Sequence, residues 1–394
     1  MVEPARASRG QAPSGPSEVV LWGVGHAHAH VLRRWARSPI PGARLTCVSD
    51  FPRFAYSGML SGVLAGQYSK DRMEADLSRL CDAAGARLIV GEVEAVDVGS
   101  RRLAVRGLPP VGFDILSVGI GSVPAHPAGS WGEDMLSIKP MQTFVDRLDR
   151  RLREVAPGLG RRPLKAAVIG GGAGGIEVAF CLPRRVEAVL GGVKLDLTLI
   201  DSHTQIGTGL RDGTARRVRK EFEARGAHLR PGLRVVRVGG GVIEVDGVER
   251  IEADVIIGVT GAASPPILGS LGLPTDAKGF LRTRPTLQTM ADAPVFAVGD
   301  SGTIEDSPTP KAGVFAVREG PILGENLARL RDGRPLLAYR PQGRYLKLLN
   351  TGDGRAIAEY SGFSARGRWC WLLKDFIDRR FMDRYREVAP GAGP

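Results

Sequence analysis

Two segments of the chain follow one plan, and this repetition constrains the fold more than any other feature. The first is VVLWGVGHAHAHVLRRWA (residues 19–36) followed by ARLTCVSD (43–50), and the second is KAAVIGGGAGGIEVAFCL (165–182) followed by LDLTLID (195–201). Each predicts a strand, a glycine turn, a helix and a second strand that ends in Asp. We therefore predict an α/β fold with two Rossmann-like, doubly wound, three-layer domains and a small C-terminal module.

The second glycine turn has the full spacing of a dinucleotide-binding turn. Gly170, Gly172 and Gly175 satisfy G-x-G-x-x-G, and Asp201 follows Gly175 by 26 residues, near the about 20 that such sites use. In this pattern the second glycine lets the backbone approach a pyrophosphate, and the acid binds the ribose 2′-hydroxyl. The turn predicts an NADH site, while the nearby His203 and Arg211 leave room for NADPH. The alternative is a glycine turn without a ligand.

The first turn departs from this pattern at one position. Gly23, Gly25 and Asp50 stand where a second nucleotide would need them, but His28 replaces the third glycine. That glycine serves helix–strand packing and does not meet the phosphate, so nucleotide binding can survive the change. A metal site of His26, His28 and His30 is the alternative, but no Cys or carboxylate ligand lies beside them. We predict no metal, and we expect His26 or His28 to donate a hydrogen bond near a pyrophosphate.

The rest of the chain sets the expected boundaries. Apolar runs that end in glycine turns, at 113–124 and 253–266, close the two repeated units. We expect residues 1–17 to be a disordered leader, 18–140 and 275–338 one discontinuous domain, 141–274 a second domain, and 339–394 the C-terminal module.

Composition argues against a nucleic-acid-binding protein, a C-x-x-C redox or metal site, and a membrane-spanning protein. The formal charge of +12 comes from scattered basic residues, and no nucleic-acid-binding motif accompanies them. The four cysteines form no C-x-x-C pair, and no apolar run is long enough to span a bilayer. We expect a cytoplasmic protein without nucleic-acid partners.

Two nucleotide sites in one chain suggest FAD together with NAD(P)H. The segment TLQTMADAPVFAVGD (286–300) predicts a strand that ends in Gly299 and Asp300, and a helix follows near Ala312. An Asp at that position can bind a sugar-alcohol hydroxyl, and the helix N-terminus can face negative charge on a flavin.

At this point the sequence resembles a known family. The segments GVGHAHAHVL, YSGML, VIGGGAGGIEVA, VFAVGD, PKAGVFAVREGP, NTGD and WLLKDFIDRRFM resemble the FAD-dependent pyridine nucleotide-disulfide oxidoreductases related to type II NADH dehydrogenases. The resemblance is strongest to the branch found fused to, or beside, selenide, water dikinase (selenophosphate synthase), and it covers residues 18–388. It implies a functional link to that kinase, whose own domain is absent here.

The resemblance assigns residues to each cofactor. Those implied for FAD are Gly23, Gly25, His26, Asp50, Tyr56, Ser57, Gly58, Met59, Gly121, Gly299, Asp300, Lys311, Ala312, Gly313 and Val314. Those implied for NADH are Gly170, Gly172, Gly175, Glu177, Asp201, Thr260 and Gly261. Glu177, near the nicotinamide, and Lys311, which would stabilise an anionic reduced flavin, are the candidate catalytic residues. For Glu177 a capping role in the first helical turn is the alternative.

The implied reaction is hydride transfer from NADH to FAD and then electron transfer to a quinone-type acceptor. The segment FAYSGMLSG (54–62) has no cysteine where disulfide reductases carry their redox pair, so electrons are expected to leave the flavin directly. Two alternatives remain: a soluble reductase serving selenium or sulfur metabolism, and a non-catalytic nucleotide-binding partner. The oligomeric state is not predicted.

The C-terminal segment predicts an amphipathic helix. Its apolar stripe would contain Leu373, Ile377, Phe381, Tyr385 and Val388, with Lys374 and Asp378 elsewhere on the wheel. Related dehydrogenases use such a region to sit on a membrane and admit quinone, which would make the protein peripheral on the cytoplasmic face. The alternative is a helix docked on the protein's own core or on a dimer partner.

Overall fold

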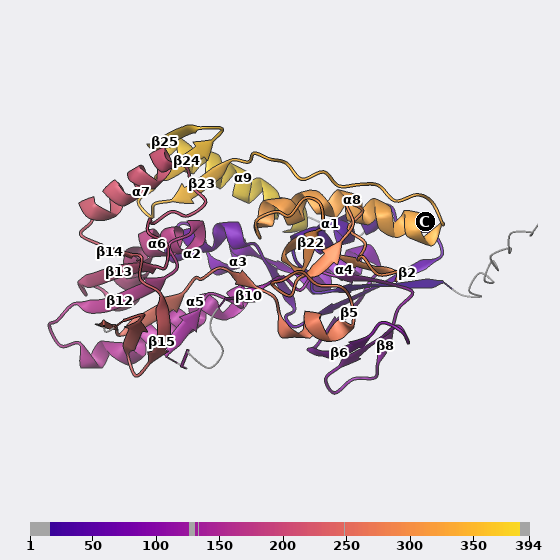
Figure 1. Cartoon of the computed structure of the whole chain (residues 1–394), viewed down its shortest axis with the longest axis horizontal. Coiled ribbons are helices and arrows are strands. Elements are labelled where there is room, and N and C mark those ends of the chain that lie inside the picture. Colours follow the sequence, from indigo (N-terminus) through magenta and orange to yellow (C-terminus); the bar gives the residue numbers. More distant parts are fainter. Residues whose placement is uncertain (1–15, 126–130, 133, 248, 387–394) are drawn as a thin grey trace, which may run out of the picture.

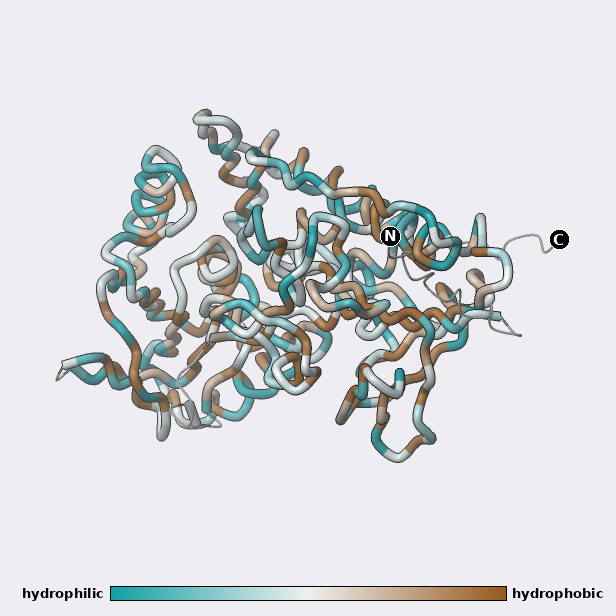
Figure 2. Tube along the Cα trace, turned by 45° about the vertical axis from the view of Figure 1, so that its right-hand side comes forward, coloured by the Kyte–Doolittle hydropathy of each residue, from teal (hydrophilic) through white to brown (hydrophobic). Residues whose placement is uncertain are grey.

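The computed structural model describes residues 16–125, 131–132, 134–247 and 249–386. It has two halves side by side, and the C-terminal segment lies along one edge of both (Figure 1). Most of the expected leader lies outside the described residues, and Ser17, its last residue, already begins strand β1. Figure 2 shows hydrophobic segments running through the interior of both halves.

A parallel five-stranded sheet forms the centre of the first half. Its order is β21-β9-β1-β2-β5, with bounds β21 (Val295–Ala297), β9 (Ile115–Val118), β1 (Ser17–Trp22), β2 (Ala43–Ser49) and β5 (Arg87–Val90). Helices α1 (His26–Trp35), α4 (Leu77–Ala84) and α8 (Gly313–Arg331) accompany it, and α1 packs against both α4 and α8. The antiparallel strands β6 (Val93–Asp97), β7 (Arg102–Val105) and β8 (Val111–Gly112) share a second apolar cluster with the sheet. Both faces are therefore buried, which suits the continuous apolar runs of the parallel strands.

The second half repeats this architecture. Its parallel sheet has the order β11-β18-β12-β13-β14, with bounds β11 (Met135–Ser137), β18 (Val255–Gly258), β12 (Leu164–Ile169), β13 (Leu195–Asp201) and β14 (His228–Pro231). Helices α5 (Met141–Val155), α6 (Ala173–Leu190) and α7 (Asp212–Ala224) accompany it, as do antiparallel strands β15 (Val235–Gly239), β16 (Val242–Val245) and β17 (Arg250–Glu252). The predicted α/β class with two Rossmann-like domains is confirmed.

Short elements connect the two halves. Strands β10 (Val123–Pro124) and β19 (Ala262–Ala263) pair antiparallel between them. Strand β11 precedes residue 140, the boundary expected from the sequence, yet it pairs with β18 in the second sheet. The other elements are β3 (Arg53–Ala55), η1 (Ser57–Met59), α2 (Leu60–Leu64), α3 (Lys70–Met73), β4 (Glu74–Asp76), η2 (Ala156–Gly158), η3 (Pro266–Leu271), β20 (Leu281–Thr283), η4 (Gly299–Ser301) and β22 (Gly302–Ile304).

The C-terminal segment forms β23 (Lys347–Asn350), β24 (Ala356–Tyr360), β25 (Phe363–Gly367) and the helix α9 (Arg368–Arg386). The predicted apolar stripe is only partly correct. Phe381 and Tyr385 are buried, but Leu373 and Ile377 are 36% and 39% exposed, and Val388 lies outside the described residues.

Lys374 and Asp378 take the buried positions of α9 instead. Lys374 Nζ and Asp378 Oδ2 form an ion pair of 3.0 Å, and Lys374 Nζ also donates to Gly58 O at 2.7 Å. This pairing makes the burial of two charged side chains tolerable, and the neighbouring apolar residues Leu373 and Ile377 face outward instead. Among the described residues, no helix is long and apolar enough to cross a membrane.

The second glycine turn offers a test of the fold. A Cβ at Gly175 would lie 1.8 Å from Gly170 O, whereas a Cβ at the neighbouring Gly174 would meet only Val259 Cγ1 at 3.5 Å. We predict that Gly175→Ala lowers the free energy of unfolding by about 2 kcal/mol or more, since the backbone must move. Gly174→Ala, the matched control, should leave stability unchanged or slightly raised. Thermal unfolding measures both, and equal melting temperatures for the two variants would contradict the tight contact.

Candidate functional site

A cavity in the first half lies where the first glycine turn meets α8. Residues from several parts of the chain line it: Gly25, His26, Ala27, His28, Ala55, Ser57, Gly119, Gly121, Lys139, Met141, Val298, Gly299, Asp300, Gly313 and Ala316. Seven of the residues assigned to FAD are in this lining, namely Gly25, His26, Ser57, Gly121, Gly299, Asp300 and Gly313. The lining does not include Gly23, Asp50, Tyr56, Gly58, Met59, Lys311, Ala312 or Val314.

His28 takes the place of the third glycine by packing into the sheet. Its Nδ1 is hydrogen-bonded to Gly23 O, and its Nε2 lies 2.8 Å from Ser117 Oγ. Burial lowers the pKa of His28 to about 4, and the hydrogen bond to Gly23 opposes this only in part, so the ring is neutral near pH 7. A Cβ at Gly119 would lie 2.6 Å from His28 Cε1. The room that the missing glycine would have provided is therefore supplied by Gly119 on the neighbouring segment.

The three histidines of this turn do not form a metal-ligand group with one another or with other side chains of the described residues. Both ring nitrogens of His28 are used within the protein. Over the described ranges, no group of three His, Cys, Asp or Glu side chains could hold a metal ion.

His26 is the residue of this turn that has an unused polar atom. Its half-buried ring lies among Phe54, Tyr56 and Phe381, at centroid distances of 5.4, 5.5 and 5.8 Å. Its Nε2 has no hydrogen-bond partner among the described residues, and burial lowers its pKa to about 4. Helix α1, which begins at His26, has no side-chain cap and no acidic residue in its first turn. A bound nucleotide phosphate would fit both features.

A group of polar side chains fixes Asp300 at the cavity. Ser122 Oγ donates to Asp300 Oδ2 at 2.6 Å, and Lys139 Nζ lies 2.6 Å from Ser122 Oγ and 3.6 Å from Asp300 Oδ2. Behind the turn, Gly299 N donates to Glu319 Oε2 at 2.5 Å. Lys139, Ser122 and Glu319 were not among the residues predicted from the sequence. The available signal for Glu319 was an acid within the mostly apolar first half of α8.

Lys311 is held beside the cavity by other groups. Its Nζ donates to Gly302 O at 2.6 Å and to Thr303 Oγ1 at 3.0 Å, and it lies 4.0 Å from the centroid of the Phe280 ring. Burial lowers the pKa of Lys311 to about 8, against the opposing effect of Asp300. Ala312 is the N-cap of α8.

Glu177 joins the C-terminal helix in a partly buried polar group. Its Oε1 accepts hydrogen bonds from Ser61 Oγ at 2.8 Å and from Asn350 N at 2.9 Å, and Lys374 Nζ lies 3.9 Å away. Tyr56 OH lies 3.1 Å from Asp378 Oδ1. We call Tyr56, Glu177, Lys374 and Asp378 the α9 polar group.

Burial and charge set the protonation of this group. Burial raises the pKa of Asp378, and Lys374 counters this in part. Burial alone would lower the pKa of Lys374, but Glu177 and Asp378 outweigh it and the net shift is upward. Burial and Asp378 hold the pKa of Tyr56 well above its usual value. Lys374 therefore stays charged, while Asp378 binds a proton more readily than an exposed carboxyl.

The second glycine turn has the strand, tight turn and helix that its sequence pattern predicts. Gly170 has a φ of +118°, and a Cβ there would lie 2.2 Å from Val259 O. Gly172 faces open space, and Thr260 Oγ1 is buried without a partner among the described residues. The open backbone at Gly172 and the unused hydroxyl of Thr260 both fit a bound dinucleotide. Asp201 is buried at the end of β13.

Glu319 makes the site's stability depend on pH. Burial raises its pKa to about 7, although the hydrogen bond from Gly299 opposes the shift. A carboxyl with a raised folded-state pKa stabilises the fold below its unfolded pKa of 4.5, and this contribution is lost as pH rises through about 7. We predict that the free energy of unfolding falls between pH 5 and pH 7.5 by up to about 3 kcal/mol through this group.

Chemical denaturation at the two pH values measures the effect. Glu319→Gln should remove it, because the amide does not titrate in this range. The control is Glu325→Gln, on the same helix, where Arg34 lowers the pKa of the carboxyl; this variant should keep the fall. An equal pH dependence in wild type and Glu319→Gln would contradict the assignment.

Comparison with known proteins agrees with this geometry. Residues 17–320 match the family model described as pyridine nucleotide-disulphide oxidoreductase. An NADH dehydrogenase-like protein of Mycobacterium tuberculosis is 26% identical over 307 residues, which are 72% of this chain and 74% of that protein. The demethylphylloquinone reductase NdbB of Synechocystis is 22% identical over 348 residues, 84% of this chain and 83% of its own.

Among solved structures, the sulfide:quinone oxidoreductase of Aquifex aeolicus has the same fold. Its TM-score is 0.78 at 17% identity, covering 94% of this chain and 92% of that one. The match to the family model spans both glycine turns and the Gly299–Asp300 turn. This chain therefore belongs to the pyridine nucleotide-disulphide oxidoreductase family and is an oxidoreductase.

Proposed function

We propose that the protein is an FAD-dependent NAD(P)H dehydrogenase that passes electrons to a quinone-type acceptor without a redox cysteine pair. One observation carries the proposal: each glycine turn has, beside it, a buried polar atom without a partner among the described residues. These atoms are His26 Nε2 and Thr260 Oγ1. Unsatisfied buried polar groups are costly, so two of them at two nucleotide turns favour two bound nucleotides.

The first turn and the cavity would hold FAD. The backbone N–H groups at the start of α1 and the ring of His26 would meet the pyrophosphate. Asp300, fixed by Ser122 and Lys139, would accept a hydrogen bond from the ribityl chain. When bound, the flavin supplies the hydride and electron chemistry that no side chain of this protein provides.

The second turn would hold NAD(P)H. Gly172 leaves its backbone open to a pyrophosphate, and α6 presents its N-terminus there. Thr260 and Gly261 follow β18 at the same sheet edge. The short β10–β19 connection keeps this site joined to the cavity of the first half.

The proposal involves no redox cysteine pair because of where the cysteines lie: Cys47 and Cys81 contact each other, but away from the residues that line the cavity. Cys47, Cys81, Cys181 and Cys370 are all free and buried, and none is among the residues that line the cavity. Burial raises the pKa of the Cys181 thiol well above its usual value, which suppresses the thiolate that disulfide chemistry requires.

A quinone acceptor would need protons as well as electrons. Reduction of a quinone by NADH consumes one proton from the protein or solvent for each NADH oxidised. Asp378, with its raised pKa, lies in hydrogen-bond contact with Tyr56, and Tyr56 adjoins Ser57 in the cavity wall. We assign the relay of this proton to the hydrogen-bonded pair of Tyr56 and Asp378. The names of the relatives, an NADH dehydrogenase-like protein and a demethylphylloquinone reductase, support this class of donor and acceptor.

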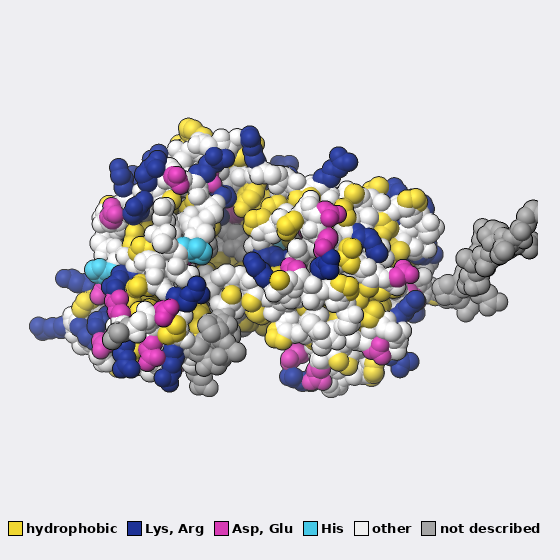
Figure 3. All heavy atoms as spheres, viewed as in Figure 1, with side chains coloured by type: hydrophobic (Ala, Val, Ile, Leu, Met, Phe, Trp, Pro, Cys, Tyr) yellow, Lys and Arg dark blue, Asp and Glu magenta, His cyan; other side chains and the backbone are white. Residues whose placement is uncertain are grey.

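A membrane surface is the proposed source of the quinone. Helix α9 and the β24–β25 hairpin expose a set of large apolar side chains: Tyr360, Phe363, Trp369, Leu372, Leu373, Phe376 and Ile377. We call this set the apolar ridge. Figure 3 shows hydrophobic atoms at the outer end of β25 and many Lys and Arg side chains over the neighbouring α7. Apolar side chains flanked by basic ones suit an anionic lipid interface.

An anaerobic visible spectrum tests the reaction. The purified protein should carry a flavin band that bleaches within seconds of adding one equivalent of NADH, and a quinone should restore it. Gly172→Ala is the matched variant, because its new Cβ meets no protein atom within 4 Å but would occupy the approach to the pyrophosphate. It should keep the fold and the flavin while losing most of the bleaching.

Three results would contradict this proposal. They are a colourless protein that FAD cannot reconstitute, a band that persists after NADH, and a Gly172→Ala variant that is reduced as fast as wild type. Selenite or polysulfide in place of quinone tests the alternative acceptors, and faster reoxidation by either would replace the quinone assignment.

Co-sedimentation with anionic vesicles tests the membrane contact. We predict that the triple variant Phe363→Ser, Trp369→Ser, Phe376→Ser lowers the vesicle-bound fraction more than tenfold, because each side chain contributes on the order of 1–2 kcal/mol of apolar burial. Val90→Ser with Leu108→Ser, at exposed apolar positions in the first half, is the control and should bind as wild type does. A wild-type protein that stays in the supernatant would overturn the contact.

A further inference from the structure

The carboxylate expected to bind the adenosine ribose is already surrounded by donors from its own chain. Asp201 Oδ2 accepts a hydrogen bond from Gly171 N, in the glycine turn. Asp201 Oδ1 accepts one from His203 N at 2.7 Å and lies 2.7 Å from His203 Nδ1. The side chain of Asp201 is only 7% exposed. Little of its charge or surface is therefore open to a ligand.

His203 covers Asp201 and faces solvent. Its side chain is 61% exposed, against 7% for the carboxylate beneath it. Because His203 Nδ1 contacts the Asp201 carboxylate, which can only accept, Nδ1 carries the hydrogen. The ring therefore directs its other nitrogen, Nε2, away from Asp201, and no contact of Nε2 appears among the described parts of the chain.

We propose that His203, and not Asp201, meets the 2′ position of the adenosine ribose, so that the site accepts NADPH as well as NADH. This inference rests on the proposed NAD(P)H site and names the residue that determines its coenzyme selectivity. It replaces the NADH preference that the sequence pattern gives to Asp201.

The imidazole suits both coenzymes because Nε2 can change its role. In the neutral ring, Nε2 accepts a hydrogen bond from the 2′-hydroxyl of NADH. In the protonated ring, Nε2–H donates to the 2′-phosphate of NADPH in a charge-assisted hydrogen bond. A dinucleotide site with an open carboxylate cannot bind the 2′-phosphate of NADPH in this way, because the acid and the phosphate repel each other.

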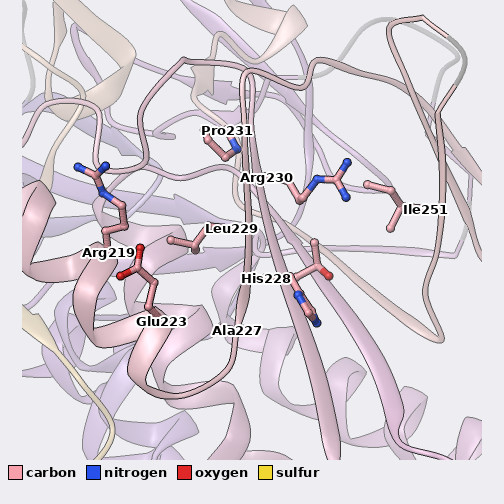
Figure 4. Close-up of a pocket in the computed structure, with 9 residues that line it drawn as sticks. Arg219, Glu223, Ala227, His228, Leu229, Arg230, Pro231 and Ile251 are labelled. Atoms are coloured by element: carbon pink, nitrogen blue, oxygen red, sulfur yellow. The ribbon is translucent and has the colours of Figure 1, made fainter.

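The same chain offers a matched control pair. His228, on the edge strand β14, lies 3.3 Å from Asp196 with its side chain 64% exposed. It lines a different hollow, together with Arg219, Glu223 and Arg230 (Figure 4). His203 and His228 therefore share exposure and a carboxylate partner, but only His203 adjoins the glycine turn.

Binding of two nucleotide fragments to the full-length protein tests the proposal without hydride transfer. Adenosine 2′,5′-bisphosphate carries the 2′-phosphate of NADPH, and adenosine 5′-monophosphate lacks it. Calorimetry on wild type should give affinities for the two fragments within tenfold of each other. His203→Ala should weaken the bisphosphate about tenfold or more, the size expected for a lost charge-assisted hydrogen bond, and should weaken the monophosphate much less. His228→Ala should change neither affinity.

Kinetics provides the second readout. The ratio of kcat/KM for NADPH to that for NADH, measured by flavin bleaching, should fall about tenfold in His203→Ala, in line with the fragment affinities. His203→Gln, which keeps a hydrogen-bonding side chain without the positive charge, should restore NADH efficiency but not NADPH efficiency.

The inference is overturned if wild type rejects the bisphosphate by more than tenfold, or if His203→Ala binds it as wild type does. It is also overturned if His228→Ala loses the bisphosphate equally. A flavin that neither coenzyme reduces would refute the proposed function, while the fragment affinities would still decide the role of His203.

Discussion

The structure depends on two close approaches of backbone to backbone, one at each glycine turn. In the second half, Gly175 lies so near Gly170 that a Cβ would overlap its carbonyl oxygen at 1.8 Å. That contact places the N-terminus of α6 over the end of β12, where Gly172 leaves the backbone open. In the first half, Gly23 approaches the segment after β9 as Gly170 approaches Val259 in the second half, since a Cβ at Gly23 would lie 2.8 Å from Gly119 O. The positions of both candidate nucleotide sites follow from these contacts.

Helix α9 connects the parts of the molecule that the glycine turns organise separately. Lys374 is buried and would be costly there without Glu177 from α6 and Asp378 from its own helix. It also bonds Gly58 O, in the segment beside the cavity of the first half. One buried cation thus contacts both halves, and this explains why the apolar side chains of α9 remain on the surface as the apolar ridge.

The sequence predicted the fold class because strand, turn and helix signals recur at local spacing, and tertiary contacts did not override them. It also predicted seven of the residues that line the cavity, because each of them lies within a short motif that can be recognised in the sequence. Lys139, Ser122 and Glu319 were missed because their role comes from segments that meet only in three dimensions. The stripe on α9 was partly wrong for a related reason. Hydrophobic periodicity assumes that charged residues face solvent, and Lys374 and Asp378 satisfy each other inside.

The contact between His28 and Gly119 gives the first turn a particular evolutionary constraint. Glycine in place of His28 would leave a void beside Ser117, and any larger residue at Gly119 would overlap the imidazole at 2.6 Å. Neither position can change freely while the other stays fixed, so substitutions at the two sites should occur as pairs in related chains. A sequence search that requires three glycines at the first turn would miss such proteins. In this chain the glycine absent at position 28 is compensated by Gly119, 91 residues further along.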